Sequence, residues 1–394
     1  MRTIAVTGTN GKTTTVELAR QLLVAAGHRP ASLGTLGLQM KGMSTYEPVL
    51  IGDDALPELV EELTNCYQAD ALLFEAFSAS IMGKLYDKLP VDIAVLTYIG
   101  EDHIEYHGSK ESYVHSKLRL FREILDEKGV AIYNIADERA NQMKDIIEQR
   151  NINSFTFGLN HKSDLCLTNV ETHSFKSEAL LLYQNREYSI SVPIIGDIFL
   201  LNWLAALSIS LQLNVQIESL LETSKSLKLP PGRLEFIGSC NGAKIYVDYA
   251  HTACALTAVL KEMRKMTRGR LHLLFGCGGG RDSAKRNKMG MVALKYADNI
   301  YITDDNPRDE DPKTIRNQIK VFCPIGVEID NRKLAIEQAI QKLELGDTLI
   351  VAGKGHENYQ EVKGNKVSFS DKETVIQCID KITSKHCNYE LQLS

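Results

Sequence analysis

A glycine-rich segment near the N-terminus, residues 5–15 (AVTGTNGKTTT), constrains the fold of this chain more than any other stretch. It joins a short apolar run, which predicts a strand at residues 3–7, to a pattern that predicts a helix ending near Gly27. A glycine-rich turn between a strand and a helix N-terminus presents backbone N–H groups and positive potential. The segment therefore predicts a phosphate-binding loop at the edge of an α/β sheet.

The side chains of this loop have the chemistry of a nucleotide-phosphate site. Gly8 and Gly11 let the backbone approach a polyphosphate closely, Lys12 supplies positive charge, and Thr13 offers a hydroxyl to Mg²⁺. The strict form of the pattern also has a glycine at position 6, where this chain has Val6. A Gly-Lys-Thr turn that binds no ligand is the simpler alternative. The residues predicted to form the cradle are Gly8, Thr9, Asn10, Gly11, Lys12, Thr13 and Thr14.

Length, charge and cysteine usage exclude several classes of protein. The 394 residues predict two or three domains, and the formal net charge of -5 argues against non-specific binding of nucleic acid. The eight cysteines form no C-x-x-C pair, which indicates reduced thiols. No signal peptide precedes the first strand, and no apolar run reaches about 18 residues. We expect a cytoplasmic protein that binds small molecules and has no nucleic-acid or membrane partner; its oligomeric state is unknown from sequence.

Strand-like apolar runs alternate with helical patterns along the chain, which predicts α/β domains with mainly parallel sheets. Residues 152–194 predict a small β excursion. The segment 229–232 (LPPG) interrupts the pattern, so we predict one domain at 1–231 and a second, Rossmann-like domain at 232–394. The predicted strands are 71–75, 93–97, 130–134, 244–248, 271–275, 299–303 and 347–352; the predicted helices include 110–128, 198–212, 286–296 and one that ends near 265.

Two polar residues of the first domain stand at predicted strand ends. Glu75 ends one strand, and His103 closes the segment 97–103 (TYIGEDH) after another. A carboxylate and an imidazole at such ends can converge on a metal ion beside the phosphate loop. Each residue alone is more often an ordinary loop residue.

Three segments of the second domain place charged residues directly after predicted strands. They are GGGR at 278–281, DNPR at 305–308 and GKGHE at 353–357. In an open α/β sheet this edge forms the ligand crevice. Two arginines and a glutamate suit a ligand that carries carboxylates and an ammonium group. The predicted substrate-binding residues are Arg281, Asp305, Asn306, Pro307, Arg308, Gly353 and Glu357.

The loop form TGTNGKT at 7–13 resembles that of Mur ligases and folylpolyglutamate synthases, and nearly the whole chain is most similar to the MurE type. The resemblance implies a P-loop ATPase domain followed by an amino-acid-binding domain, with ATP and Mg²⁺ as cofactors. It implies that Thr13, Glu75 and His103 bind Mg²⁺, although Tyr98 stands where the family has Asn. Lys117 resembles a family lysine whose carbamate helps to hold a second Mg²⁺. Without the resemblance, Lys117 is a surface helix lysine.

The resemblance also implies roles for three residues around the predicted domain boundary. Asn202, in a helix similar to the family's G-x-x-N-x-x-N-x-x-A-A, corresponds to the residue that reaches adenine. Arg233, in the sequence GRLE, corresponds to the arginine that reaches the γ-phosphate, and Asp248, in DYAHT, to the aspartate that contacts ribose. The simpler alternatives are a buried helix with one polar residue and a solvated linker arginine.

The three charged segments of the second domain are similar to the meso-diaminopimelate site of MurE-type ligases, and DNPR is the form associated with diaminopimelate rather than lysine. The acceptor side departs from the family. Ile51, Gly52, Phe77, Gly83 and Leu85 stand where MurE-type ligases bind a UDP-linked muramoyl dipeptide. The chain also begins on the ATPase domain, without the uridine-binding domain of that type. We therefore expect a smaller carboxylic acid as acceptor.

The combined prediction is an ATP-dependent ligase that forms an amide through an acyl phosphate, with Lys12, Lys117, Arg233 and His103 as catalytic residues. Its substrates are a small-molecule acid and a diaminopimelate-like amino acid. The alternatives are a MurE-type ligase whose uridine binding is supplied otherwise, a folylpolyglutamate-synthase-like ligase, and a non-catalytic nucleotide- or amino-acid-binding homologue.

Overall fold

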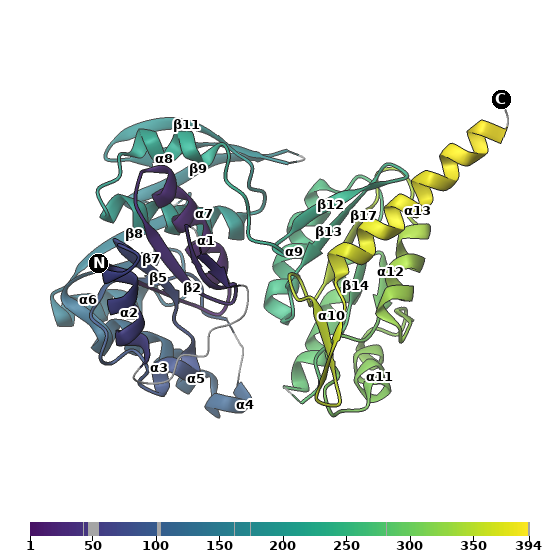
Figure 1. Ribbon diagram of the computed structural model, residues 1–394, viewed down its shortest axis with the longest axis horizontal. Coiled ribbons are helices and arrows are strands. Elements are labelled where there is room, and N and C mark those ends of the chain that lie inside the picture. Colours follow the sequence, from purple (N-terminus) through teal and green to yellow (C-terminus); the bar gives the residue numbers. More distant parts are fainter. Residues whose placement is uncertain are drawn as a thin grey trace. The chain divides into compact units, whose positions relative to one another are not determined.

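The computed structural model describes residues 1–41, 43–45, 55–100, 104–160, 162–173, 175–280 and 282–392. The chain forms two compact units, Met1–Pro230 and Pro231–Ser394 (Figure 1). Each unit has a sheet of its own with helices packed against it, as expected for the α/β class. The mainly parallel sheets confirm the predicted fold class.

The first unit is built on a sheet with the strand order β11-β10-β9-β8-β7-β6-β1-β5-β2-β3-β4. The neighbouring strands from β9 to β2 in this order are parallel, and antiparallel pairs extend the sheet at both ends. The strands are β1 Arg2–Thr7, β2 Pro30–Gly34, β3 Gly37–Met40, β4 Met43–Thr45, β5 Ala71–Glu75, β6 Val91–Leu96, β7 Leu125–Asn134, β8 Asn153–Leu159, β9 Leu165–Thr172, β10 Ser177–Tyr183 and β11 Arg186–Val192.

The helices of this unit are α1 Lys12–Ala25, α2 Ala55–Asn65, α3 Ser78–Met82, α4 Ile104–His107, α5 Lys110–Arg119, α6 Ala140–Arg150, α7 Asp197–Gln212 and α8 Ile217–Ser224. Helix α1 packs against α7, whose buried positions are nearly all apolar or small. Strand β1 lies between β5 and β6, with Val6 beside both Glu75 and Val95. The carboxyl ends of these three parallel strands therefore meet at one edge of the sheet, where the glycine-rich loop begins.

The predicted helix at 110–128 was wrong beyond residue 124. Helix α5 continues into one wide turn, η1 Leu120–Ile124, and β7 begins at Leu125. Leu125 is buried and pairs with Val91 of β6. The sequence Asp-Glu-Lys at 126–128 has good helix propensity, but pairing with a buried strand outweighs that weak local preference.

The second unit has the strand order β12-β13-β17-β14-β15-β16, in which only β12 is antiparallel to its neighbour. Its strands are β12 Glu235–Cys240, β13 Ala243–Asp248, β14 Leu271–Phe275, β15 Asn299–Ile302, β16 Val327–Glu328 and β17 Thr348–Ala352, with a separate hairpin of β18 Tyr359–Val362 and β19 Asn365–Ser368. Its helices are α9 Ala253–Met266, α10 Ala284–Tyr296, α11 Pro312–Phe322, α12 Arg332–Gln341 and α13 Asp371–Gln392.

The core strands of this unit lie within one or two residues of their predicted bounds. The sequence analysis missed β12, β16, the hairpin, α11, α12 and α13. Helices α12 and α13 pack on each other, and α10 contacts both α9 and α11. No helix within the described ranges is long and apolar enough to cross a membrane.

Candidate active site

The glycine-rich loop connects β1 to α1 and has the backbone conformation that its glycines predict. Gly8 has a φ of 149° and Gly11 a φ of 91°, values that other residues rarely adopt. A Cβ at Gly8 would clash with Thr97 Oγ1, and one at Gly11 would clash with Asn202 Oδ1. Both glycines are therefore required by close packing as well as by backbone conformation.

Two lysines converge on a single carbonyl of this loop. Lys12 Nζ donates to Gly8 O at 2.8 Å and to Thr9 O at 3.2 Å, and Lys117 Nζ donates to Gly8 O at 2.9 Å. Lys117 is only 2% exposed, and its ammonium lies 4.7 Å from the centre of the Tyr113 ring. The interpretation of Lys117 as a surface lysine is therefore wrong, and the side chain reaches the loop.

The segment that follows β6 holds the glycine-rich loop in place through hydrogen bonds. Thr9 N donates to Tyr98 O at 2.6 Å, and Gly100 N donates to Thr9 Oγ1 at 2.9 Å. Thr97 Oγ1 donates to Asn10 O at 2.6 Å. Tyr98 contributes its backbone to this contact, so the departure from Asn at this position leaves the loop support intact.

Oxygen ligands suitable for a hard cation gather beside the loop. Thr13 Oγ1 lies 3.1 and 3.0 Å from the two carboxylate oxygens of Glu75, which is 4% exposed. Thr35 also binds Glu75, through N–H to Oε1 at 2.7 Å and Oγ1 to Oε2 at 3.2 Å. A hydroxyl and a carboxylate fit Mg²⁺, which prefers oxygen ligands and keeps several waters.

The sequence analysis predicted two further residues of the metal site, Lys117 and His103, and the structure describes only Lys117. Lys117 binds the carbonyl of Gly8, and His103 lies outside the described residues. Over the described ranges no three His, Cys, Asp or Glu side chains form a metal-binding group. Thr35 is a further residue of this cluster that the sequence analysis missed, because a Gly-Thr pair after a strand has no distinctive pattern.

Helix α7 places Asn202 against the loop. Asn202 is 5% exposed, and the clash described for Gly11 shows that its amide lies beside the first turn of α1. Of the positions that depart from the family on the acceptor side, Phe77 is exposed and its ring centre lies 5.6 Å from Lys12 Nζ. Ile51 and Gly52 are outside the described part of the chain.

The start of the second unit brings an arginine and two aromatic rings together. The guanidinium of Arg233 stacks 4.5 Å from the ring centre of Tyr249, and Tyr249 lies 5.3 Å from His356. Burial, followed by the positive charges of Arg233 and Lys354, lowers the pKa of His356 to about 4. His356 is therefore neutral at neutral pH and adds no positive charge to those of Arg233 and Lys354.

Asp248 is almost fully buried at the end of β13. Its Oδ2 accepts from Leu234 N at 2.6 Å and its Oδ1 from Ala250 N at 2.7 Å. Burial is the main reason why the pKa of Asp248 is raised, against the opposing effects of Arg233 and the two backbone N–H groups. Asp248 thus ties the turn that carries Arg233 to the turn after β13.

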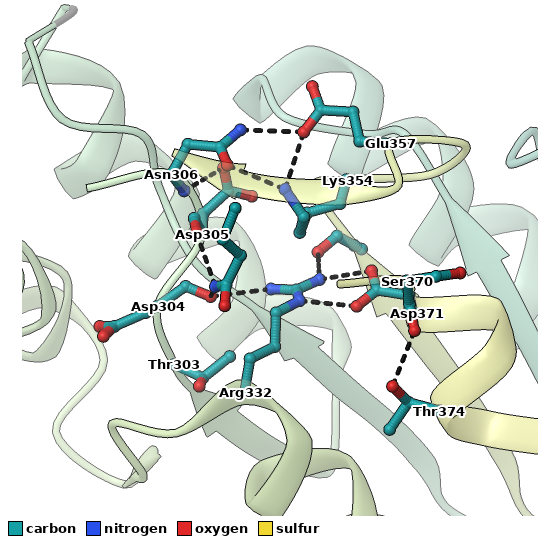
Figure 2. Close-up of polar contacts among 12 residues, drawn as sticks. Thr303, Asp304, Asp305, Asn306, Arg332, Lys354, Glu357, Ser370, Asp371 and Thr374 are labelled. Carbon is teal, nitrogen blue, oxygen red and sulfur yellow. Dashed lines mark hydrogen bonds and ion pairs between the residues drawn. The ribbon is translucent and has the colours of Figure 1, made fainter. Parts of the chain in front are cut away.

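The strand-end segments of the second unit meet as predicted. Asn306 Nδ2 donates to Glu357 Oε2 at 2.9 Å, and Lys354 Nζ donates to Asn306 Oδ1 at 2.9 Å and to Glu357 Oε2 at 2.8 Å (Figure 2). Lys354 is completely buried. A Cβ at Gly353 would lie 2.7 Å from Asp305 Oδ2, so the two loops are in close contact.

Asp305 is charged within this cluster. Burial raises its pKa, but the positive charges of Lys354 and Arg332, with the N–H of Asn306, outweigh that effect and the net pKa is lowered. Asn306 N donates to Asp305 Oδ1 at 2.7 Å. This hydrogen bond fixes the orientation of the Asn306 backbone.

Arg308 follows Pro307 in the DNPR segment and has a φ of 54°. Its Nε donates to Glu361 Oε2 at 2.9 Å and its Nη1 to Gly279 O at 2.8 Å. Neither of these two contacts uses Nη2. Arg281 lies outside the described residues. Lys354 and Glu361 also contact these residues and were not among the predicted site residues. Only the GKGHE motif, which contains Lys354, offered a sequence signal.

Comparison with known proteins gives a consistent family. Residues 6–210 match the Mur ligase middle domain, and residues 232–355 match the Mur ligase glutamate ligase domain. A UDP-N-acetylmuramoyl-L-alanyl-D-glutamate–2,6-diaminopimelate ligase of Mesorhizobium japonicum is 37% identical over 374 residues, which cover 94% of this chain and 77% of that protein. The ligase of the same name from Rickettsia rickettsii is 38% identical over 390 residues, covering 95% and 79%.

Solved structures agree with this assignment. A UDP-N-acetylmuramoyl-L-alanyl-D-glutamate–2,6-diaminopimelate ligase matches with a TM-score of 0.68 and 32% identity, over 97% of this chain and 78% of that chain. Folylpolyglutamate synthase of Mycobacterium tuberculosis, complexed with ADP and AMPPCP, matches with a TM-score of 0.74 and 16% identity, over 89% and 88%. The second likeness concerns the fold alone. With two matching domains and relatives of this similarity, the chain belongs to the Mur ligase family of ATP-dependent amide-forming ligases.

Proposed function

We propose that this ligase joins a diaminopimelate-like amino acid to a carboxylate acceptor through an acyl phosphate. In this proposal residues 1–231 bind ATP and residues 232–394 bind the amino acid. The observation that supports the amino-acid assignment is at the carboxyl edge of the second sheet, where Asn306 binds Glu357, and Arg308, two residues further on, binds the carbonyl of Gly279. This set offers an amide, a guanidinium and a carboxylate to a ligand that has carboxylates and an ammonium group.

The first unit supplies the phosphoryl-transfer groups. The loop N–H groups at 8–14 bind the phosphates, and Lys12 moves from the Gly8 carbonyl to the phosphate oxygens. Thr13 and Glu75, with His103 and carbamylated Lys117, would hold Mg²⁺, and the ion would offset negative charge on the phosphates. Asn202 of the first unit binds adenine. Two further residues come from the second unit: Asp248 binds ribose, and Arg233 stabilises the transferred phosphoryl group because its planar guanidinium can bind two oxygens.

The second unit presents the nucleophile. Glu357 and Asn306 bind the ammonium end of the amino acid, and Arg281 and Arg308 bind its carboxylates. The attacking amine must be neutral when it reaches the acyl phosphate, so the ammonium that Glu357 holds is the group that remains protonated. Amide formation then releases phosphate, and the loop groups that bound the γ-phosphate hold the departing oxygens.

The acceptor has two candidates. The relatives are named for ligation to UDP-N-acetylmuramoyl-L-alanyl-D-glutamate, and their similarity favours that acceptor over the smaller acid expected from the sequence. The specific observation in favour of a smaller acid is exposed Phe77 beside Lys12, where an apolar ring replaces a polar contact. The comparisons give this second candidate no support.

The direct test supplies ATP, Mg²⁺ and meso-diaminopimelate with either the UDP-linked dipeptide or a panel of small free acids. Phosphate release and product mass are then followed. We expect phosphate release that depends on both the amino acid and an acid. ATP hydrolysis unaffected by either substrate would contradict the ligase assignment, and turnover of the dipeptide would reject the smaller acid.

The amino-acid assignment has its own prediction at Arg308. Arg308→Ala removes charge-assisted hydrogen bonds, each worth about 1.5 to 3 kcal/mol, so the KM for the amino acid should rise roughly 10-fold or more. The KM for ATP should change little. Steady-state kinetics with each substrate varied in turn measures both constants. Equal affinity of the wild-type protein for lysine and diaminopimelate in calorimetry would refute the assignment.

A further inference from the structure

An ion pair in the second unit is completely buried and has no part in the function proposed above. Arg332 begins α12 and Asp371 begins α13, and both side chains have 0% exposure. Arg332 Nε donates to Asp371 Oδ1 at 2.7 Å and Arg332 Nη2 to Asp371 Oδ2 at 2.7 Å. Burying two charges costs several kcal/mol of desolvation, and such a pair adds little stability over an apolar pair of equal volume.

The same guanidinium also binds two main-chain carbonyls. Arg332 Nη2 donates to Ala352 O at 2.9 Å, and Arg332 Nη1 donates to Asp304 O at 3.3 Å. Figure 2 shows the guanidinium extending from the Asp371 carboxylate toward the segment of Asp304 and Asp305. Ala352 is the last residue of β17, and Asp304 follows β15. One side chain therefore connects the ends of two strands that are not neighbours in the sheet order.

Each tethered carbonyl lies immediately before a segment of the amino-acid site. Asp304 precedes Asp305 and Asn306, and Ala352 precedes the turn that carries Lys354 and Glu357. The Asn306 amide, the Lys354 ammonium and the Glu357 carboxylate form a closed set of contacts at 2.8 to 2.9 Å. The spacing of the two strand ends thus sets whether Asn306 and Glu357 face the same ligand atom.

We propose that Arg332 and Asp371 are positioning residues for the amino-acid substrate: the buried pair fixes the distance between the Asp305–Asn306 segment and the Gly353–Glu357 turn. The inference rests on the proposed function of that site. The guanidinium fork is needed because one planar group must bind two carboxylate oxygens and two carbonyls at once. Asp371 holds the fork in plane and balances its charge.

The opposite edge of the same sheet supplies a matched control. His272 Nε2 lies 3.0 Å from Asp347 Oδ2, and this pair is also buried, with side-chain exposures of 1% and 4%. Asp347 directly precedes β17, and His272 is the second residue of β14. This pair ties strands at the end remote from the amino-acid site. Its loss should reduce stability without displacing Asn306 or Glu357.

The experiment compares Arg332→Lys, Asp371→Asn and the control Asp347→Asn in the full-length chain. Lysine keeps the charge of Arg332 but cannot make the forked contact, and asparagine keeps the size of Asp371 but not its charge. For each protein the unfolding temperature, kcat, the KM for ATP and for diaminopimelate, and calorimetric binding of diaminopimelate are measured.

We expect all three variants to unfold at lower temperature. Arg332→Lys and Asp371→Asn should raise the KM for diaminopimelate about 10-fold or more, which corresponds to a tenfold loss of binding, and leave the KM for ATP within about 2-fold. Asp347→Asn should leave both KM values unchanged. If Arg332→Lys does not fold, Asp371→Asn alone decides.

Two results would overturn the inference. If the pair variants lose stability but bind diaminopimelate like Asp347→Asn, the pair is only structural. If the wild-type protein itself does not bind diaminopimelate, the amino-acid assignment fails and the inference fails with it. Calorimetric binding of diaminopimelate to the wild-type protein distinguishes these two results.

Discussion

At the scale of single residues, two lysines of the first unit bind the same acceptor, the carbonyl oxygen of Gly8. Lys12 reaches it from the adjacent helix turn, and Lys117 reaches it from α5, more than a hundred positions along the chain. In the unmodified chain this carbonyl accepts hydrogen bonds from both ammonium groups. The two lysines differ in surroundings, because Lys117 is buried against Tyr113 whereas Lys12 lies beside exposed Phe77.

This difference predicts different responses to the loss of each lysine. Lys12→Ala removes a phosphate ligand, and Lys117→Ala removes the proposed carbamate; each should lower kcat at least about 100-fold. Acetate or another short carboxylate can occupy the space left in Lys117→Ala and should restore part of the activity. The same salts should leave Lys12→Ala inactive. Full activity of Lys117→Ala without added carboxylate would rule out the carbamate role.

His356 predicts a pH dependence of stability. Because burial, Arg233 and Lys354 lower its pKa from 6.5 to about 4, the unfolded chain binds more protons than the folded chain between these values. The stability present above pH 6.5 is therefore lost as the pH falls toward 4. The loss is at most about 3 kcal/mol and smaller after solvent screening, because His356 is not fully buried.

Urea unfolding of the wild-type protein and His356→Asn at pH 7.5, 6 and 5 checks this sign. The wild-type protein should lose more stability than the variant between pH 6 and 5. At pH 7.5 and above, the two stability curves should run parallel, because His356 is neutral in both states. Identical slopes over the whole range would show that His356 does not contribute.

At the scale of elements, the strand ends decide where functional side chains lie. Loops that follow β1, β5 and β6 carry the residues proposed to bind phosphate, and loops that follow β14, β15 and β17 carry those proposed to bind the amino acid. Parallel pairing places these ends at one edge of each sheet, so segments far apart in sequence meet there. The helices behind the strands fix this arrangement through close packing.

Gly290 of α10 shows how tight that packing is. A Cβ at this position would lie 2.8 Å from Ile319 O and 3.3 Å from Phe322 Cβ, both on α11. Gly290→Val should force the two helices apart and lower the free energy of unfolding by about 1 to 3 kcal/mol. Met291→Ala, at an exposed position of the same helix, should stay within about 0.5 kcal/mol. Urea midpoints measure both, and equal midpoints would contradict the packing argument.

At the scale of the whole molecule, the two units divide the proposed substrates between them. Each unit has its own sheet and core. The groups proposed to bind phosphate and those proposed to bind the amino acid are on different units, so the chain must bring both together for catalysis.

Hydrogen exchange of the full-length protein tests this division. Diaminopimelate should slow exchange at 276–280, 303–308 and 353–361, because it orders the loops of the second unit. A non-hydrolysable ATP analogue should slow exchange at 8–14. Protection of 8–14 by diaminopimelate alone, without change in the second unit, would contradict the assignment of the amino-acid site.

The sequence by itself determined the glycine-rich loop between β1 and α1, the α/β class and the strand-end positions of Asn306, Arg308 and Glu357. These features depend on local rules: the glycine conformations at positions 8 and 11, the hydrophobic alternation of buried strands, and the fixed edge at which parallel strands end. These features can be predicted without knowing which segments, distant in the sequence, are in contact.

Only the tertiary structure decided the contacts between distant segments. It brought Lys117 to Gly8, showed that β7 begins at Leu125 where a helix was expected to continue, and paired Arg332 with Asp371 behind the proposed amino-acid site. A lysine or arginine carries no local sign that it is buried. Its partner is fixed by packing across the fold, where the desolvation of a charge must be balanced by an opposite charge or a carbonyl.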